Sequence, residues 1–253
     1  MTIMNRLSSQ LQSAFDRRQA LKIISGLQNF NFESVAMVVR AAELGGATFV
    51  DIAADAGLIN LAKTITSLPV CVSAVEPAKL AEAVANGADL VEIGNYDKFY
   101  AQGRVFTADE VLELTRATRA LLPHTALSVT VPHTLPLDRQ VILAEQLVAV
   151  GADIIQTEGG TSSAPAHAGV LGLIEKAAPT LAAAHAISRA VSVPVLCASG
   201  LSSVTAPMAI AAGASGIGVG TAVNQLNDEI AAIAVVRSLR EALTSQVAVS
   251  NSK

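Results

Sequence analysis

The sequence repeats one six-residue pattern four times, and this repeat constrains the fold more than any other feature. The copies are GATFVD at 46–51, GADLVE at 87–92, GADIIQ at 151–156 and GASGIG at 213–218. A glycine tolerates the left-handed conformation that ends a helix, and the apolar residues after it predict a buried strand. Four helix-then-strand units indicate a parallel sheet whose strands are joined by crossover helices.

Length and strand count favour a closed barrel. A (β/α)8 barrel needs about 250 residues, and this chain has 253, of which 51% are hydrophobic. Strands are predicted at 20–26, 49–53, 69–75, 90–95, 126–131, 154–158, 193–199 and 216–222. We predict an N-terminal helix within 1–19 that closes the bottom, a single (β/α)8 TIM barrel of the phosphate-binding type over 20–246, and a polar tail over 247–253. A doubly wound open sheet is the alternative.

Charge and composition argue against several classes of function. The net charge of −4 and the lack of a basic cluster argue against nucleic-acid binding. Prolines and polar residues interrupt the apolar stretch at 193–223, so no membrane span is predicted there. Cys71 and Cys197 fall in separate predicted strands, which is typical of a reducing compartment. The first 18 residues lack the apolar core of a signal peptide, and a cytoplasmic location follows.

The sixth position of the repeat predicts a polar barrel interior. Side chains alternate along a strand, so Asp51, Glu92, Gln156 and Gly218 should point inward from even-numbered strands. Glu158 should point inward one layer higher. The inward residues of the odd-numbered strands include Lys22, Ser73, Ser128, Thr130 and Ser199.

Four of these residues carry the predicted chemistry: Lys22, Asp51, Glu92 and Glu158. Buried charges require partners or a ligand. One hypothesis is a structural ion-pair network. The other is a catalytic cluster in which Lys22 is a Schiff-base amine or general base, Asp51 orients it, and Glu92 or Glu158 transfers a proton. Imine chemistry, acid–base isomerisation and simple hydroxyl binding all remain open.

The ends of strands seven and eight predict a phosphate site. Glycines without a Cβ let an anion approach backbone N–H groups, and the loops after these two strands are the recurrent phosphate site of such barrels. The alternative is that the glycines only permit tight packing. The predicted substrate and phosphate ligands are Ser199, Gly200, Gly218, Gly220 and Thr221, together with Gln156, Ser128 and Thr130.

Histidines and aromatic residues give weaker indications. His133 follows strand five on the upper face and is an acid–base candidate, and His167 is a weaker one. Six of the eight aromatic residues fall in the loops after strands one and four, where they could stack on a ligand ring or cover an apolar cluster. No spacing of His, Cys, Asp and Glu matches a zinc site, so no metal is predicted.

Three segments carry a family resemblance: ALKIISGL with Asn29 and Phe30, VDIA at 50–53, and QTEGG at 156–160. Through them the chain resembles the uncharacterised cyanobacterial and plastid family called hypothetical chloroplast reading frame twenty-three. The resemblance implies a soluble TIM-barrel protein of photosynthetic organisms and brings no established activity. The loops of strands seven and eight are more distantly similar to those of thiazole synthase and indoleglycerol-phosphate synthase, which supports the phosphate.

Two classes of function follow. The first is an enzyme, of the lyase, isomerase or synthase type, that acts on a small phosphorylated metabolite. In an alternative form of this hypothesis, the loops after strands seven and eight bind flavin mononucleotide. The second is a non-catalytic metabolite-binding or regulatory barrel. The expected partner is a small phosphorylated molecule, with no nucleic acid and no membrane. A homo-oligomer is possible, and a plastid-encoded protein would lie in the stroma.

Overall fold

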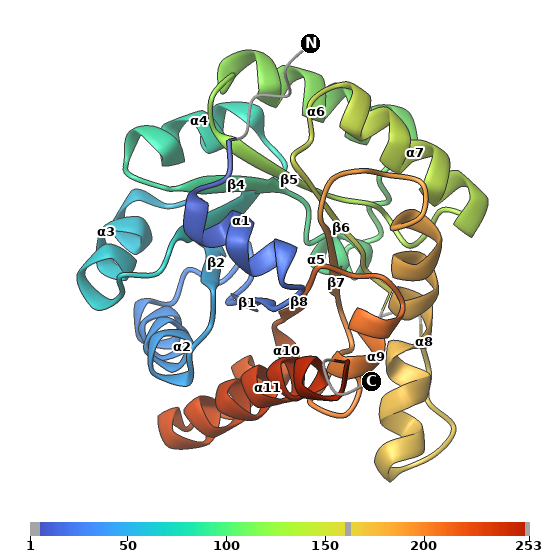
Figure 1. The fold of residues 1–253 in the computed structure, drawn as a ribbon. Helices are drawn as coiled ribbons and strands as arrows, with labels where there is room; N and C mark the ends of the chain where they lie inside the picture. The colour runs from blue at the N-terminus through green and yellow to red at the C-terminus, as the bar shows by residue number, and fades with distance from the viewer. Residues whose placement is uncertain (1–5, 160–162, 251–253) are drawn as a thin grey trace.

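Eight parallel strands close into a barrel in the computed structural model, which describes residues 6–159 and 163–250. Each strand pairs with the next along the chain, and β8 pairs with β1 (Figure 1). The strands are β1 (Ala20–Ile24), β2 (Phe49–Ala53), β3 (Val70–Ala74), β4 (Leu90–Ile93), β5 (Ala126–Thr130), β6 (Ile154–Gln156), β7 (Val195–Ala198) and β8 (Gly216–Val219). The closed ring confirms the predicted TIM barrel and excludes the open sheet.

Helices surround this ring on its outer face (Figure 1). The helices that follow the eight strands are α2 (Phe32–Gly45), α3 (Ala56–Ile65), α4 (Pro77–Ala85), α6 (Ala108–Leu121), α7 (Leu137–Ala149), α8 (Gly169–Ile187), α9 (Ala206–Ala211) and α11 (Glu229–Ser250). Two four-residue helices that the sequence did not predict, α5 (Asp97–Tyr100) and α10 (Thr221–Asn224), lie in the loops after β4 and β8. Both of these loops open on the upper face, where the strands end.

The Gly-Ala repeat forms the same helix-to-strand junction four times. Its glycines, at 46, 87, 151 and 213, all have φ between 79° and 114°. The next residue then donates its N–H to a carbonyl five residues back in the preceding helix, as from Ala47 to Ala42 at 2.9 Å. The third residue donates to the previous strand, as from Thr48 to Leu21 at 2.8 Å. One pattern therefore ends a helix and sets the register of the strand that follows.

A small apolar cluster closes the bottom of the barrel. α1 (Ser9–Asp16) crosses the lower mouth (Figure 1) and buries Leu11, Ala14 and Phe15 against inward side chains of the strands. The rings of Phe15 and Phe49 meet edge to face with centroids 6.3 Å apart. The lower end of the interior is thus apolar, as the predicted N-terminal helix requires.

Two helices differ from the prediction. The apolar and small residues over 169–190 contain Pro179, which would favour two separate helices, but α8 is one continuous helix with Pro179 inside it. A proline removes one backbone hydrogen bond, and packing on β7 outweighs that loss. α11 continues to Ser250, beyond the predicted end of the barrel at residue 246. Over the described ranges, α8 alone has the length and composition of a membrane span, and 33% of that window is buried.

The apolar cluster between α1 and the strands (the lower plug) should stabilise the barrel without affecting its upper face. We expect Phe15→Ala to lower the free energy of unfolding by about 3–4 kcal/mol, because the side chain is buried and its removal leaves a cavity. The matched control Phe30→Ala removes a ring that is 56% exposed and should change stability by less than about 0.5 kcal/mol. Urea unfolding measures the free energy of unfolding of both variants. Equal losses in the two would contradict a stabilising role of the lower plug.

Candidate functional site

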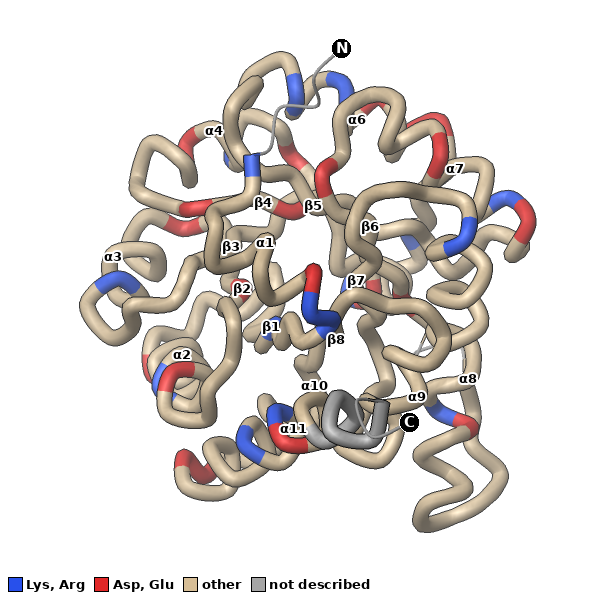
Figure 2. Tube along the Cα trace, in the orientation of Figure 1, with Lys and Arg blue, Asp and Glu red and all other residues tan. Residues whose placement is uncertain are grey.

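A buried lysine lies between two buried carboxylates in the middle of the barrel. Lys22 on β1 places its Nζ 2.8 Å from Glu92 Oε2 and 3.4 Å from Asp51 Oδ2. All three side chains are fully buried. Figure 2 shows the blue segment of β1 and the red segment of β2 inside the ring of helices, whereas most other charges lie on the outer helices. The predicted contact between Lys22 and Asp51 is thus present, and Glu92 joins it.

Neighbouring polar side chains satisfy the two carboxylates. Glu92 accepts hydrogen bonds from Ser128 Oγ at 2.6 Å and from Gln156 Nε2 at 2.8 Å. Asp51 accepts one from Ser73 Oγ at 2.6 Å and one from Asn95 Nδ2 at 3.0 Å. The inward polar layer predicted from the repeat is therefore one connected network.

The charges in this network shift the pKa of two of its members. Burial lowers the pKa of Lys22, but the carboxylates of Asp51 and Glu92 outweigh burial and hold it above its ordinary value. Lys22 therefore stays protonated, which disfavours the Schiff-base amine. Burial raises the pKa of Asp51 to about 6, with Glu92 adding to the rise and Lys22 opposing it. One ammonium group thus balances one of the two acids.

A cavity of about 570 Å³ opens above this network, at the carboxyl ends of the strands. Seven of the predicted residues line it: Gln156, Glu158, Ser199, Gly200, Gly218, Gly220 and Thr221. Active sites of such barrels lie at this face. The loops after β7 and β8 thus meet Glu158, which follows β6, in one cavity.

The two loops contain backbone N–H groups that lack an acceptor among the described residues. Ser199 and Gly200 both have positive φ, 77° and 73°, so the chain turns sharply as it leaves β7. A serine rarely adopts this conformation, and such strain clusters at functional sites. Within the described residues, the N–H groups of Gly200, Thr221 and Ala222 have no hydrogen-bond acceptor. These donors are available to an anion.

Packing accounts for part of the glycine pattern. A Cβ on Gly216 would lie 2.5 Å from the carbonyl oxygen of Ala20, so this glycine is required by the contact of β8 with β1. A Cβ on Gly218 would meet Ala198 at 3.0 Å, and one on Gly220 would meet the Ile24 carbonyl at 3.2 Å. The alternative of tight packing therefore applies to Gly216, while Gly218 and Gly220 also form the cavity wall.

Six predicted site residues do not line the cavity. Ser128 and Thr130 were predicted to bind substrate, but both are buried beside Glu92 and hydrogen-bonded within the network. Gln156 and Asn95 lie both in the cavity wall and in the network. The other four predicted site residues outside the cavity wall are Lys22, Asp51, Glu92 and His133. The geometry of the first three favours the structural ion-pair network, and their catalytic role stays a prediction.

Glu158 has a separate set of partners. Its Oε1 accepts hydrogen bonds from the Tyr100 hydroxyl and from the backbone N–H of His133, the latter at 3.1 Å. His133 Nδ1 lies 3.0 Å from the same oxygen. Burial raises the pKa of Glu158, although His133 and Tyr100 oppose the rise. Burial lowers the pKa of His133, but Glu158 outweighs it and the net shift is upward.

The loop aromatics cover an apolar cluster of their own. Tyr96 stacks on Phe106 with centroids 4.4 Å apart, and Phe99 meets Phe106 edge to face at 5.3 Å. Phe30 is more than half exposed. Among the described residues, no aromatic side chain lines the cavity. The expected stacking on a ligand ring therefore loses its support.

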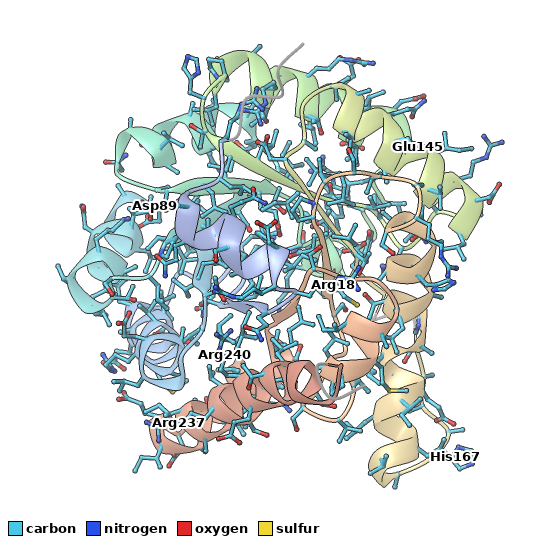
Figure 3. All side chains as sticks on the ribbon, viewed as in Figure 1. Arg18, Asp89, Glu145, His167, Arg237 and Arg240 are labelled. Carbon is cyan, nitrogen blue, oxygen red and sulfur yellow. The ribbon has the colours of Figure 1, made fainter. Side chains whose placement is uncertain are left out.

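The other histidine candidate lies outside the cavity wall. His167 is exposed, and its Nδ1 lies 2.6 Å from Glu175 Oε1. Figure 3 places His167 at the outer tip of the molecule, beside the free end of α8. It does not line the cavity, so its role as an acid–base residue stays a prediction that the cavity does not support.

Sequence reasoning missed much of the cavity wall. The loop after β1 contributes Ser25, Gln28 and Asn29, and the start of α2 contributes Ser34. Asn29 holds this loop, since its Nδ2 donates to Ser25 Oγ and Ser34 Oγ at 3.0 Å each. The loop after β4 contributes Asn95, Asp97 and Lys98. The one available signal was that polar residues directly follow strands at the face where sites form.

The fold and the cavity define a (β/α)8 barrel with a cavity at the carboxyl ends of its strands. The chain belongs to the family described as "Protein of unknown function (DUF561)", which matches residues 7–249. A relative from Porphyra purpurea, "Uncharacterized protein ycf23", is 39% identical over 239 residues and covers 94% of this chain and 90% of its own length. These matches confirm the resemblance found in the sequence.

Solved structures share the fold at low identity. The (S)-3-O-geranylgeranylglyceryl phosphate synthase from Thermoplasma acidophilum, in complex with its substrate sn-glycerol-1-phosphate, has a TM-score of 0.61 at 14% identity. It covers 94% of this chain and 100% of its own. The thiamine phosphate pyrophosphorylase from Pyrococcus furiosus has a TM-score of 0.57 at 20% identity, covering 90% and 97%. At these identities the likeness concerns the fold.

The raised pKa of Asp51 gives stability a defined pH dependence. The folded protein binds a proton at Asp51 up to about pH 6, whereas the unfolded chain releases it near 3.8. The contribution of this group to stability therefore falls as pH rises through that window, by about 3 kcal/mol in total. Asp51→Asn lacks this dependence, so its stability relative to the wild type should rise between pH 4 and pH 7. Urea unfolding at several pH values measures it, and a constant difference would contradict the shift.

Proposed function

We propose that this protein binds a small phosphorylated metabolite in the upper cavity and acts on it as an enzyme of the lyase, isomerase or synthase type. The observation that carries the proposal is a single cavity lined both by the glycine loops after β7 and β8 and by the buried carboxylate of Glu158. The loops would hold the phosphate through backbone N–H groups. Glu158 would face the part of the substrate that reacts.

The rest of the cavity suits a hydroxylated substrate. Ser25, Asn29 and Ser34 add hydroxyl and amide groups to its wall, and Lys98 adds a positive charge. Hydroxyl and amide groups orient polar ligands by hydrogen bonds. The neighbouring synthase that carries sn-glycerol-1-phosphate in its structure has the same fold, which supports a substrate of this class.

The proposal gives the predicted residues different roles. Of the four predicted catalytic residues, Glu158 alone lies in the cavity wall. We therefore assign it to the part of the substrate that reacts. Lys22, Asp51 and Glu92 support the floor of the cavity through Gln156 and Asn95.

The remaining expectations are proposals of the same kind. Flavin mononucleotide is disfavoured, because no aromatic residue of the described chain lines the cavity. A non-catalytic barrel would keep the phosphate site without turnover. A homo-oligomer and a location in the cytoplasm or plastid stroma stay predictions.

A negative charge placed in the glycine loops should weaken phosphate binding. Thr221 is the exposed first residue of α10 and lines the cavity. We expect Thr221→Asp to weaken the binding of inorganic phosphate and of glycerol phosphate at least about tenfold, because the carboxylate repels the anion. Thr221→Asn is the neutral control of the same shape and should bind more tightly than Thr221→Asp. Calorimetric titration measures the three affinities, and equal affinities would place the phosphate elsewhere.

The second prediction separates binding from turnover. The wild type should convert at least one member of a panel of glycerol, triose, pentose and hexose phosphates, followed by mass spectrometry. Glu158→Gln keeps the shape of the side chain but loses its charge, so it should lose at least about 100-fold in turnover and still bind inorganic phosphate. Phosphate binding without turnover of any kind by the wild type would favour the non-catalytic barrel.

A further inference from the structure

Three side chains from three successive loops meet at the edge of the cavity. Asp97 comes from α5 after β4, His133 follows β5, and Glu158 follows β6. One ligand atom from each, two carboxylate oxygens and an imidazole nitrogen, lies within 4.8 Å of the other two. Asp97 and Glu158 also line the cavity. The sequence gave no indication of this group, because its members are separated by long stretches that follow no metal-binding motif.

The charges in this group differ from those in the network below. Lys22 lies between Asp51 and Glu92, but in the part of the chain that the structure describes no lysine or arginine forms an ion pair with Glu158. Glu158 is 5% exposed, and the negative charge of Asp97 acts on it as well as on His133. A divalent cation would supply positive charge at the point where the three ligand atoms converge.

The surrounding residues hold the three ligands in place. The backbone N–H of His133 donates to Glu158 Oε1 at 3.1 Å, which ties the loop after β5 to the end of β6. The ring of Tyr100 meets the His133 ring edge to face with centroids 4.9 Å apart, and its hydroxyl donates to Glu158. Outer contacts of this kind orient metal ligands and tune their affinity.

We propose that Asp97, His133 and Glu158 bind a divalent transition-metal ion, with coordination positions left open toward the cavity. Carboxylates suit Mn²⁺, and imidazole suits the later first-row ions, so the mixed set favours a first-row divalent ion over Ca²⁺. Three protein ligands with open positions are typical of metal sites that act on a substrate. Binding of the ion stands apart from the proposed function, whereas its contact with a phosphorylated substrate rests on that function.

Mn²⁺ binding tests the site directly. The full-length protein, freed of metal with a chelator, is titrated with Mn²⁺, and the electron paramagnetic resonance signal of free Mn²⁺ is followed. We expect one saturable ion per chain. Asp97→Asn and Glu158→Gln should each weaken that binding at least about tenfold. Asp138→Asn, the same change at an exposed position on α7, should leave it unaltered.

Two further readouts separate the possible failures. Thermal unfolding of the metal-free variants checks that each is folded, and both substitutions at the site keep side-chain shape. Thr221→Asp should lose phosphate and retain Mn²⁺, so failure of the phosphate site is distinguishable from failure of the metal site. Lack of a stoichiometric ion in the wild type, or equal Mn²⁺ affinity in the wild type, Asp97→Asn and Glu158→Gln, would overturn the metal site.

Discussion

The ion pairs of Lys22 with Asp51 and Glu92 are the interaction on which the rest of the interior depends. An unpaired charge in a barrel core costs several kcal/mol, and here one ammonium group lies within 3.4 Å of both carboxylates. Ser73, Ser128 and Gln156 complete the hydrogen bonds of the acids. The layer above the apolar plug is therefore polar, connected and closed.

That closed layer separates two kinds of chemistry. Below the amides of Gln156 and Asn95, Lys22 forms ion pairs with Asp51 and Glu92, and none of the three lines the cavity. Above them, Glu158 is held by Tyr100 and His133, and it does line the cavity. The geometry of the first group favours a structural role. The second is placed where a substrate, or an ion together with a substrate, can reach it.

The inward positions and the glycine loops were predictable because they follow from periodicity. Alternation along each strand placed Lys22, Asp51 and Glu92 in the interior, and the glycines at the ends of β7 and β8 marked the loops that line the cavity. Alternation could not tell which inward residues would be sealed off. Ser128 resembled a ligand-binding residue and instead hydrogen-bonds Glu92. The meeting of Asp97, His133 and Glu158 depends on loops whose conformation no short pattern encodes.

The sequence by itself determined the barrel, since one local pattern ends a helix and starts a strand four times, and local hydrogen bonds carry that information. It also determined that the interior would hold charges. Only the tertiary structure decided which charges neutralise one another and which line the cavity. The physical reason is that the partner of a charge is chosen by distance in space, and the strands bring together residues as remote as Lys22 and Gln156, whose Nζ and Oε1 lie 3.1 Å apart.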